Sequence, residues 1–180
     1  RMQHFFLFLG KCSTAFISLC LALLLITMPT SCGVYTFRDV SIDYNKIKTV
    51  KIFFIENKAS YVNPLLSPRL TDNLQQKVVQ FTKLNRTNND DAHYQISGYI
   101  SGYNVTTSGV SGQQAATNRL SVSAHIVFKN TVDNEEKEFD ITRDFDFSAT
   151  QSLTDAESSL LPKVVTNLTD EIFNRIFSNW

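Results

Sequence analysis

Three segments of the chain alternate between apolar and polar side chains, and this alternation limits the fold more than any other feature of the sequence. Residues 92–105, 119–129 and 138–147 place an apolar residue at every second position over most of their length. Because successive side chains of a strand point to opposite faces, these segments predict strands of a sheet with one covered and one solvated face. Tyr99, Tyr103 and Val105 are expected on the face away from the core.

Two other segments have the period of an amphipathic helix. In residues 64–81 an apolar residue recurs every three or four positions: Leu66, Leu70, Leu74, Val78 and Phe81. The N-cap of this helix is expected to be Asn63 or Ser67, with Pro64 or Pro68 at the first helical position.

Residues 154–180 carry the second helical stripe, which consists of Leu161, Val164, Val165, Leu168, Ile172 and Ile176. Thr154 and Glu157 have the spacing of a capping box at its start. Pro162 lacks a main-chain N–H, so we expect a short first turn and a main helix that restarts there.

Residues 47–56, rich in β-branched and aromatic side chains, add a first strand, and the element order is β-α-β-β-β-α. The first two strands are joined by a helix and should be parallel neighbours, whereas the later strands should form antiparallel hairpins. Both helices must bury their stripes on the same face. The sequence therefore predicts an α+β fold, a two-layer sandwich in which a four-stranded mixed sheet carries two helices on one face.

Two connections between strands stand out. Residues 130–135 supply a short turn, with Asp133 and Asn134 as its formers. Residues 106–118 (TTSGVSGQQAATN) form a long irregular stretch, and connections of this length are often functional.

The N-terminus has the composition of a targeting segment. Residues 15–28 contain no charge and follow the basic residues Arg1, His4 and Lys11. This run is shorter than the roughly 20 apolar residues that cross a bilayer as a helix, and it fits the hydrophobic region of a signal peptide. A membrane anchor is the alternative interpretation.

Residues 28–33 (MPTSCG) resemble the lipobox of bacterial lipoproteins, in which small residues precede a Cys that is acylated after the signal is removed. Cleavage before Cys32 would also remove Cys12 and Cys20, so no internal disulfide is possible. We expect a lipoprotein signal peptide over 1–31, lipidated Cys32 and a tether over 32–46, and one domain over 47–180. An ordinary signal peptide followed by a free Cys32 thiol is the alternative.

The residues offer little for catalysis. Lys and Arg number 17, as do Asp and Glu, and the absence of a basic stripe argues against nucleic acid. His93 and His125 lack a third ligand at metal spacing, and no nucleophile motif or phosphate loop is present. The acidic residues at 133–136, 140, 144 and 146 fall on the solvated side rather than around a cleft. We expect no catalytic site, metal or cofactor.

Arg143 is an even number of positions from Phe139 and Phe145 along the strand, so it should point toward the same apolar face. Either a bulge reverses this parity, or its guanidinium lies at the rim of the face and meets a carboxylate or an anionic ligand.

Several segments together resemble the LptE family of lipopolysaccharide-assembly lipoproteins: residues 31–37 (SCGVYTF), 61–67 (YVNPLLS), 118–120 (NRL), 144–147 (DFDF), 172–175 (IFNR) and 179–180 (NW). The resemblance covers essentially the whole chain after residue 31. Two residues depart from the family pattern. Pro29 bears on the efficiency of signal processing, and Pro162 bears on the continuity of the last helix.

This resemblance implies a non-enzymatic lipoprotein at the periplasmic side of the outer membrane, which sits in the lumen of the LptD β-barrel and helps it place lipopolysaccharide in the outer leaflet. It implies Arg119, Lys129 and Arg143 as candidate lipopolysaccharide contacts. The candidate barrel contacts are in the long connection: Thr106, Ser108, Gly109, Val110, Gln113, Gln114 and Asn118.

Two other functions remain open. A lipoprotein accessory of another envelope transport or secretion complex would have much the same sequence, and the barrel that accompanies the chain would distinguish it. A lipid-anchored hydrolase would require a cleft where a nucleophile and a base converge.

Overall fold

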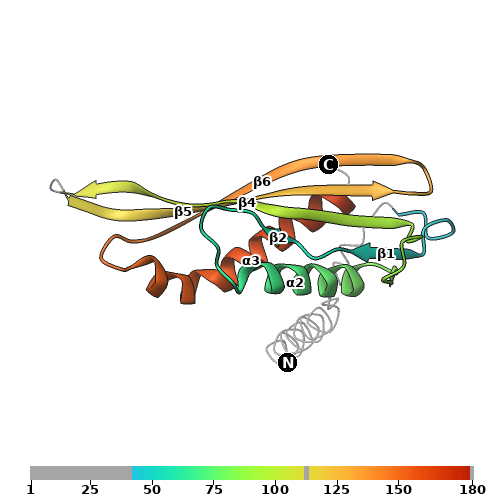
Figure 1. Ribbon diagram of the computed structural model, residues 1–180, viewed down its shortest axis with the longest axis horizontal. Coiled ribbons are helices and arrows are strands. Elements are labelled where there is room, and N and C mark those ends of the chain that lie inside the picture. The colour runs from blue at the N-terminus through green and yellow to red at the C-terminus, as the bar shows by residue number, and fades with distance from the viewer. Residues whose placement is uncertain (1–41, 112–113, 179–180) are drawn as a thin grey trace, which may run out of the picture. The chain divides into compact units, whose positions relative to one another are not determined.

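The computed structural model describes residues 42–111 and 114–178, and this part of the chain forms an α+β fold with two helices on one face of a sheet (Figure 1). In chain order the elements are β1 (Thr49–Ile52), β2 (Glu56–Asn57), α2 (Leu66–Phe81), β3 (Asn85–Arg86), β4 (Tyr94–Ser111), β5 (Gln114–Asn130), β6 (Glu135–Ser148) and α3 (Leu153–Phe177). Neither described helix is long and apolar enough to cross a membrane. Residues 1–41, which include Cys32 and most of the expected tether, lie outside the described part.

The sheet has six strands rather than the predicted four, in the order β3-β1-β4-β5-β6, with β2 beside β4. β1 and β4 are parallel neighbours joined by α2, as predicted, and β4, β5 and β6 are antiparallel. The two additional strands are two residues long. β3, which follows α2 closely, pairs with β1 in a polar stretch where the sequence pattern predicts no strand. β2 is separated from β1 because the predicted strand 47–56 is interrupted after Ile52, where the Ile55 N–H instead donates to Thr71 Oγ1 at 3.1 Å.

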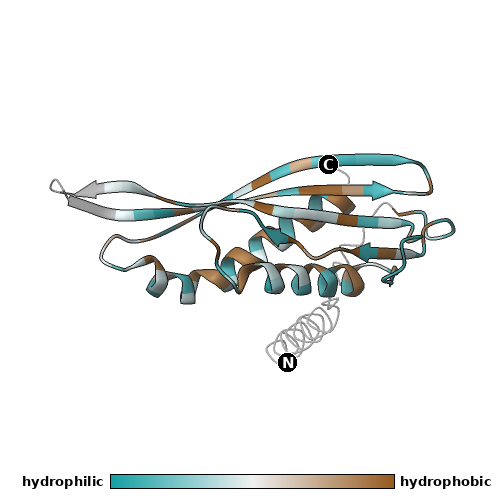
Figure 2. Ribbon diagram, in the orientation of Figure 1, coloured by the Kyte–Doolittle hydropathy of each residue, from teal (hydrophilic) through white to brown (hydrophobic). Residues whose placement is uncertain are grey.

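The apolar stripes of both helices meet the sheet. Leu66, Leu70, Leu74 and Val78 of α2 are completely buried, as are Leu168 and Ile172 of α3. Figure 2 shows the corresponding hydrophobic colour on the two helices. Phe81, which was predicted to belong to the α2 stripe, is 49% exposed because it lies at the end of the helix.

The helix starts differ from the predicted caps. Leu65 is the N-cap of α2 and makes no side-chain cap bond, whereas Asn63 accepts from the Leu65 N–H in the turn before the helix. α3 is capped by Ser152, which accepts from the Asp155 N–H, rather than by the predicted box of Thr154 and Glu157.

Pro162 does not interrupt α3, which contradicts the predicted restart. The helix is continuous from Leu153 to Phe177 with the proline inside it. Pro162 points to solvent, whereas Leu161 and Val164 on either side are buried against the core. Packing of this stripe outweighs the lost hydrogen bond, because most helical stability in proteins comes from tertiary contacts.

The connection predicted over residues 106–118 is a strand hairpin. β4 continues to Ser111 and β5 starts at Gln114, so the two strands extend as a ribbon past the end of β6, which pairs with β5 only as far as Thr117 (Figure 1). The alternation of apolar and polar residues that marks a strand is hidden here by small and polar side chains and by register shifts around Gly109. By contrast, the predicted turn before β6 is present, and Asn134 adopts a positive φ of 53°, which asparagine tolerates.

A register shift between Ile100 and Gly102 reverses the predicted parity of the second half of β4. Tyr103 lies opposite Val122 and Val105 opposite Leu120, so both belong to the helix side of the sheet. Tyr99 lies opposite His125 on the outer side, as predicted. Just before this register shift the main chains of β4 and β5 lie very close together at Gly98. A Cβ at Gly98 would lie 2.3 Å from the His125 main-chain oxygen.

Candidate functional site

The face of the sheet turned away from the helices, called the outer face here, carries a ladder of polar side chains between β5 and β6. Four pairs at consecutive outer-face positions are hydrogen-bonded: Arg119–Asp146, Ser121–Asp144, Ser123–Thr142 and His125–Asp140, at 2.7–2.9 Å. Each pair is directly opposite in the strand register, so the alternation of two long strands aligns them. The outer face is therefore polar and internally hydrogen-bonded.

Two guanidinium nitrogens of Arg119 donate to the two carboxylate oxygens of Asp146. Nε donates to Oδ1 at 2.7 Å and Nη2 donates to Oδ2 at 3.1 Å. The hydrogen bond from Arg119 lowers the pKa of Asp146 below its ordinary range, and the same bond raises the pKa of Arg119. Both side chains are more than 40% exposed, so solvent screens the pair and an anionic ligand can compete for the guanidinium.

The three predicted lipopolysaccharide contacts do not form one site. Lys129 is exposed on the same face as Arg119, but ten residues of strand separate them, which is about 33 Å. Arg143 lies on the opposite face, because it is in register with the buried Val122.

Arg143 keeps the parity of its apolar neighbours and meets a carboxylate at the rim of the helix side. It donates to Glu171 of α3, which also accepts from Arg175 at 2.9 Å. The hydrogen bond from Arg175, together with the charge of Arg143, lowers the pKa of Glu171. Of the two alternatives for Arg143, the ion pair is present and no bulge reverses the strand.

The predicted barrel contacts lie in and around the ribbon. Thr106, Ser108, Gly109 and Asn118 are in β4 and β5, and Ser108 Oγ donates to the Thr117 carbonyl at 3.4 Å. Val110 and Gln114 are in the strands, but the positions of their side chains are outside what the structure describes, and Gln113 lies outside the described residues.

The two histidines of the domain are not brought together. His93 Nδ1 accepts from the Lys48 N–H at 2.9 Å beside β1, whereas His125 stacks against Tyr99 and bonds Asp140. Within residues 42–111 and 114–178, no three His, Cys, Asp or Glu side chains are grouped so that they could hold a metal ion.

A buried carboxylate that the alternation did not predict lies beneath β4. Glu157 of α3 accepts from Tyr103 at 2.6 Å and from Tyr61 at 3.3 Å, and the two tyrosine rings are stacked with centroids 5.3 Å apart. Burial, followed by the contact with Glu157, raises the pKa of both tyrosines. The bulge in β4 places Tyr103 on this side, and Gly102 at the register shift is the sequence signal that could have indicated it, because glycine inside a strand often marks a bulge.

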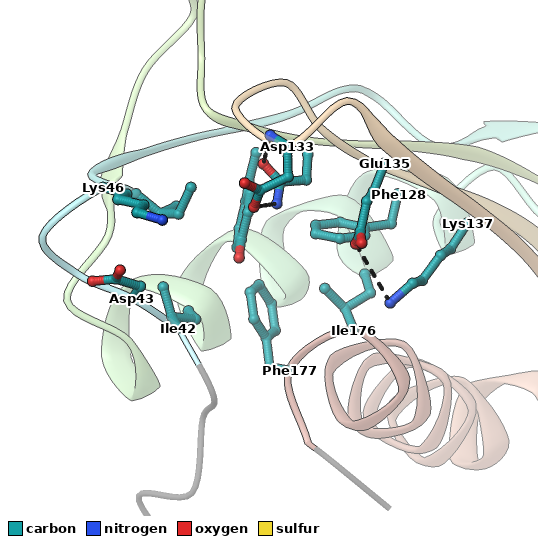
Figure 3. Close-up of a pocket in the computed structure, with 12 residues that line it drawn as sticks. Ile42, Asp43, Lys46, Phe128, Asp133, Glu135, Lys137, Ile176 and Phe177 are labelled. Atoms are coloured by element: carbon teal, nitrogen blue, oxygen red, sulfur yellow. Dashed lines mark hydrogen bonds and ion pairs between the residues drawn. The ribbon is translucent and has the colours of Figure 1, made fainter.

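A cavity of about 250 Å³ lies where β4 and β6 begin and α3 ends (Figure 3). Its apolar walls include Tyr94, Phe128 and Phe177. Figure 3 shows Asp43 and Lys46 on one side, Glu135 and Lys137 on the other, and Ile176 and Phe177 between them. Burial and the nearby Asp133 and Glu135 raise the pKa of Tyr94. Ile42, the first residue that the structure describes, is part of the lining, and we assign no ligand to this cavity.

Comparison with protein families identifies one match. The model of the LptE family, described as lipopolysaccharide-assembly, matches residues 47–176, from just before β1 to the last turn of α3. A search of curated proteins finds no match.

Among solved structures, the rare lipoprotein B of Shewanella oneidensis is 13% identical, with a TM-score of 0.46 over 72% of this chain and 90% of that one. The PelC dodecamer of Paraburkholderia phytofirmans is 12% identical, with a TM-score of 0.46 over 74% and 91%. Lipoprotein GNA1162 of Neisseria meningitidis is 10% identical, with a TM-score of 0.42 over 71% and 99%. These likenesses are too distant to contribute to the assignment.

The family match extends over well more than half of the chain and includes every described strand, all of α2, and α3 except its last residue, Phe177. The chain belongs to the LptE family of lipopolysaccharide-assembly proteins.

Proposed function

We propose that this protein is an outer-membrane lipoprotein, anchored through acyl chains on Cys32, which plugs and supports an LptD-like β-barrel during insertion of lipopolysaccharide into the outer leaflet. The family match over residues 47–176 carries this proposal. The domain would lie at the periplasmic side and within the barrel lumen.

The chemistry of the outer face supports a fit inside a barrel. The interior of an outer-membrane barrel is polar, and a folded domain inside it needs a polar surface. The ladder from Arg119–Asp146 to His125–Asp140 provides such a surface, and the β4–β5 ribbon provides a polar extension from the same sheet.

The proposed role is binding and support rather than catalysis. The polar side chains of the outer face hydrogen-bond to each other in cross-strand pairs instead of converging on a reacting atom. A barrel plug works by shape and charge and requires no nucleophile or cofactor.

Co-purification tests the partner. The tagged full chain, extracted in mild detergent, should be accompanied by one outer-membrane barrel of the LptD type, identified by mass spectrometry. Recovery of a different transport barrel would support an accessory of another envelope complex and would reject the LptD assignment. Intact-mass measurement of the same sample should show Cys32 with added acyl chains, and a bare thiol would reject the proposed anchor.

Lipopolysaccharide binding by the outer face is tested with Arg119→Gln and Lys129→Gln. Each cation should contribute to phosphate or carboxylate binding, so each variant is expected to raise the Kd for purified lipopolysaccharide about three- to tenfold. Lys83→Gln removes an exposed cation that precedes β3 and is the matched control. Equal Kd values for all three variants and the unmodified protein would reject a role for these residues.

A further inference from the structure

The outward side of β6 is an unusually long sheet edge. Within the described residues β6 has one strand neighbour, β5, and Figure 1 shows it at the margin of the sheet. β6 is 14 residues long, whereas a typical strand has about five or six residues. In an antiparallel strand every second residue directs its N–H and C=O away from the neighbour, so about seven residues of β6 offer unpaired main-chain groups.

Of the features with which proteins block unwanted pairing, β6 carries charged side chains, including Arg143 on the helix side, but it is not short and has no proline and no bulge. Edge strands are usually kept short or interrupted by proline or by bulges. β6 contains no Pro or Gly, and its register with β5 runs from Asn130–Glu135 to Thr117–Ser148 without a shift. The β4–β5 pairing, in contrast, has three shifts. β6 is therefore long and regular enough to pair with another strand.

The side chains of β6 determine which residues an added strand must carry. The outer-face positions carry five carboxylates, Glu136, Glu138, Asp140, Asp144 and Asp146. Across from them β5 supplies two permanent cations, Lys129 and Arg119. The outer face of the edge therefore has an excess of negative charge, which favours Lys or Arg at the facing positions of an added strand.

On the helix side, the same strand would cover apolar surface. Phe139 and Phe145 pack against the core but remain partly exposed, and the Arg175 guanidinium lies over the Phe139 ring at 5.6 Å from its centroid. Apolar residues at alternate positions of an added strand would extend this layer. Arg143, which lies between these two positions and pairs with Glu171, would face a polar residue of the added strand.

We propose that the β6 edge binds an extended basic segment of a different polypeptide, whose lysines or arginines alternate with apolar residues, by adding it to the sheet as a further strand. A second copy of β6 does not satisfy this requirement, because carboxylates would then lie opposite carboxylates. Main-chain hydrogen bonds would provide affinity, and the carboxylate row would select the partner. This inference does not depend on the identity of the barrel.

The probe is a ten-residue peptide in which lysine alternates with valine and threonine. It is titrated into the full chain in mild detergent and followed by amide hydrogen exchange. Amides of residues 135–148 should exchange at least tenfold more slowly at saturation. A peptide of the same charge with two central prolines, which cannot pair as a strand, should give no such protection. Equal protection by both peptides, or protection confined to another element, would overturn the proposal.

Charge reversal tests the selectivity. Glu136→Lys with Glu138→Lys should weaken peptide binding at least tenfold, and should allow binding of the matching peptide that has glutamate in place of lysine. The control, Asp72→Lys with Asp91→Lys, changes net charge equally at exposed positions away from β6. Unchanged affinity in the first variant would show that these carboxylates do not select the partner, and an equal loss in the control would show general charge attraction. Either result would overturn the proposal. A negative result would leave the lipopolysaccharide-assembly proposal intact, because that rests on the family match.

Discussion

Glu157 shows how one residue can connect elements that are distant in the sequence. The residue is 9% exposed, and its carboxylate lies between Tyr103 of β4 and Tyr61 of the loop before α2, while its main chain belongs to α3. A buried charge is tolerated only when hydrogen bonds replace the lost water. The two tyrosine hydroxyls provide these bonds and thereby tie the start of α3 to the sheet.

Tyr103→Phe should therefore destabilise the fold by about 2 kcal/mol, since it leaves a buried carboxylate with the longer bond to Tyr61 alone. Urea unfolding measures the change. Tyr99→Phe removes a hydroxyl from the outer face and should alter stability by less than about 0.5 kcal/mol. Equal effects of the two substitutions would mean that Glu157 is not held mainly by Tyr103.

Glu171 gives the fold a pH dependence on the acid side. Its pKa is lowered by Arg175 and Arg143, so the carboxylate contributes stability above its unfolded pKa of about 4.3 and loses that contribution as the pH falls through the lower folded value. Glu171→Gln should lower the Tm by about 2–5 °C at pH 7, which corresponds to about 1 kcal/mol.

The difference in Tm between Glu171→Gln and the unmodified protein should shrink as the pH falls below the unfolded pKa of about 4.3, and it should vanish once the pH is also below the lower folded pKa. Thermal unfolding followed by circular dichroism across this range measures it. A Tm difference that is the same at every pH would show that the substitution acts through packing rather than through the ion pairs.

At the scale of elements, long regular patterns were predicted correctly and local irregularities were not. The apolar stripe from Leu66 to Val78 and the alternation from Leu120 to Phe128 identified α2 and β5, because many residues contribute to each pattern. The bulge after Ile100 involves one extra residue in a long strand, and that single residue moves Tyr103 across the sheet. The short strands β2 and β3 exist only because β4 and β1 offer partners.

The candidate site was predicted less completely than the fold. The sequence placed Arg119 and the acidic residues of β6 on a solvated face, and it raised the rim ion pair as one explanation for Arg143. It did not indicate that Asp146 holds Arg119, because cross-strand partners follow from register, which depends on the turn before β6.

Pro162 offers a test at the element scale. Proline inside a helix is about 3 kcal/mol less favourable than alanine, although part of this is recovered because proline restricts the unfolded chain. Since Pro162 is exposed and α3 is continuous, Pro162→Ala should raise the free energy of unfolding by about 1–2 kcal/mol. Lys163→Ala, at the next exposed position, should change it by less than about 0.5 kcal/mol. Destabilisation by Pro162→Ala would mean that the proline sets a bend that α3 needs.

Over the whole domain, the two faces of the sheet differ in what they contact: one packs against the helices and the other is exposed. The helix side holds the apolar core and is closed by α2 and α3, whereas the outer face and the β6 edge expose organised polar groups and unpaired main chain. A domain whose sheet is covered by helices on one face and is polar on the other is suited to bind a polar partner surface. The proposed barrel lumen and the proposed basic strand are two such surfaces, and they use different parts of the sheet.

The central proposed role of this protein is assistance in delivering lipopolysaccharide to the cell surface. Depletion of the full chain in its native host, followed by quantification of lipopolysaccharide accessible at the outer leaflet, tests this role most directly. We expect surface lipopolysaccharide to fall while newly made lipopolysaccharide accumulates inside the outer membrane, and the unmodified chain to restore delivery. Surface lipopolysaccharide that stays at its normal level after complete depletion would reject the role.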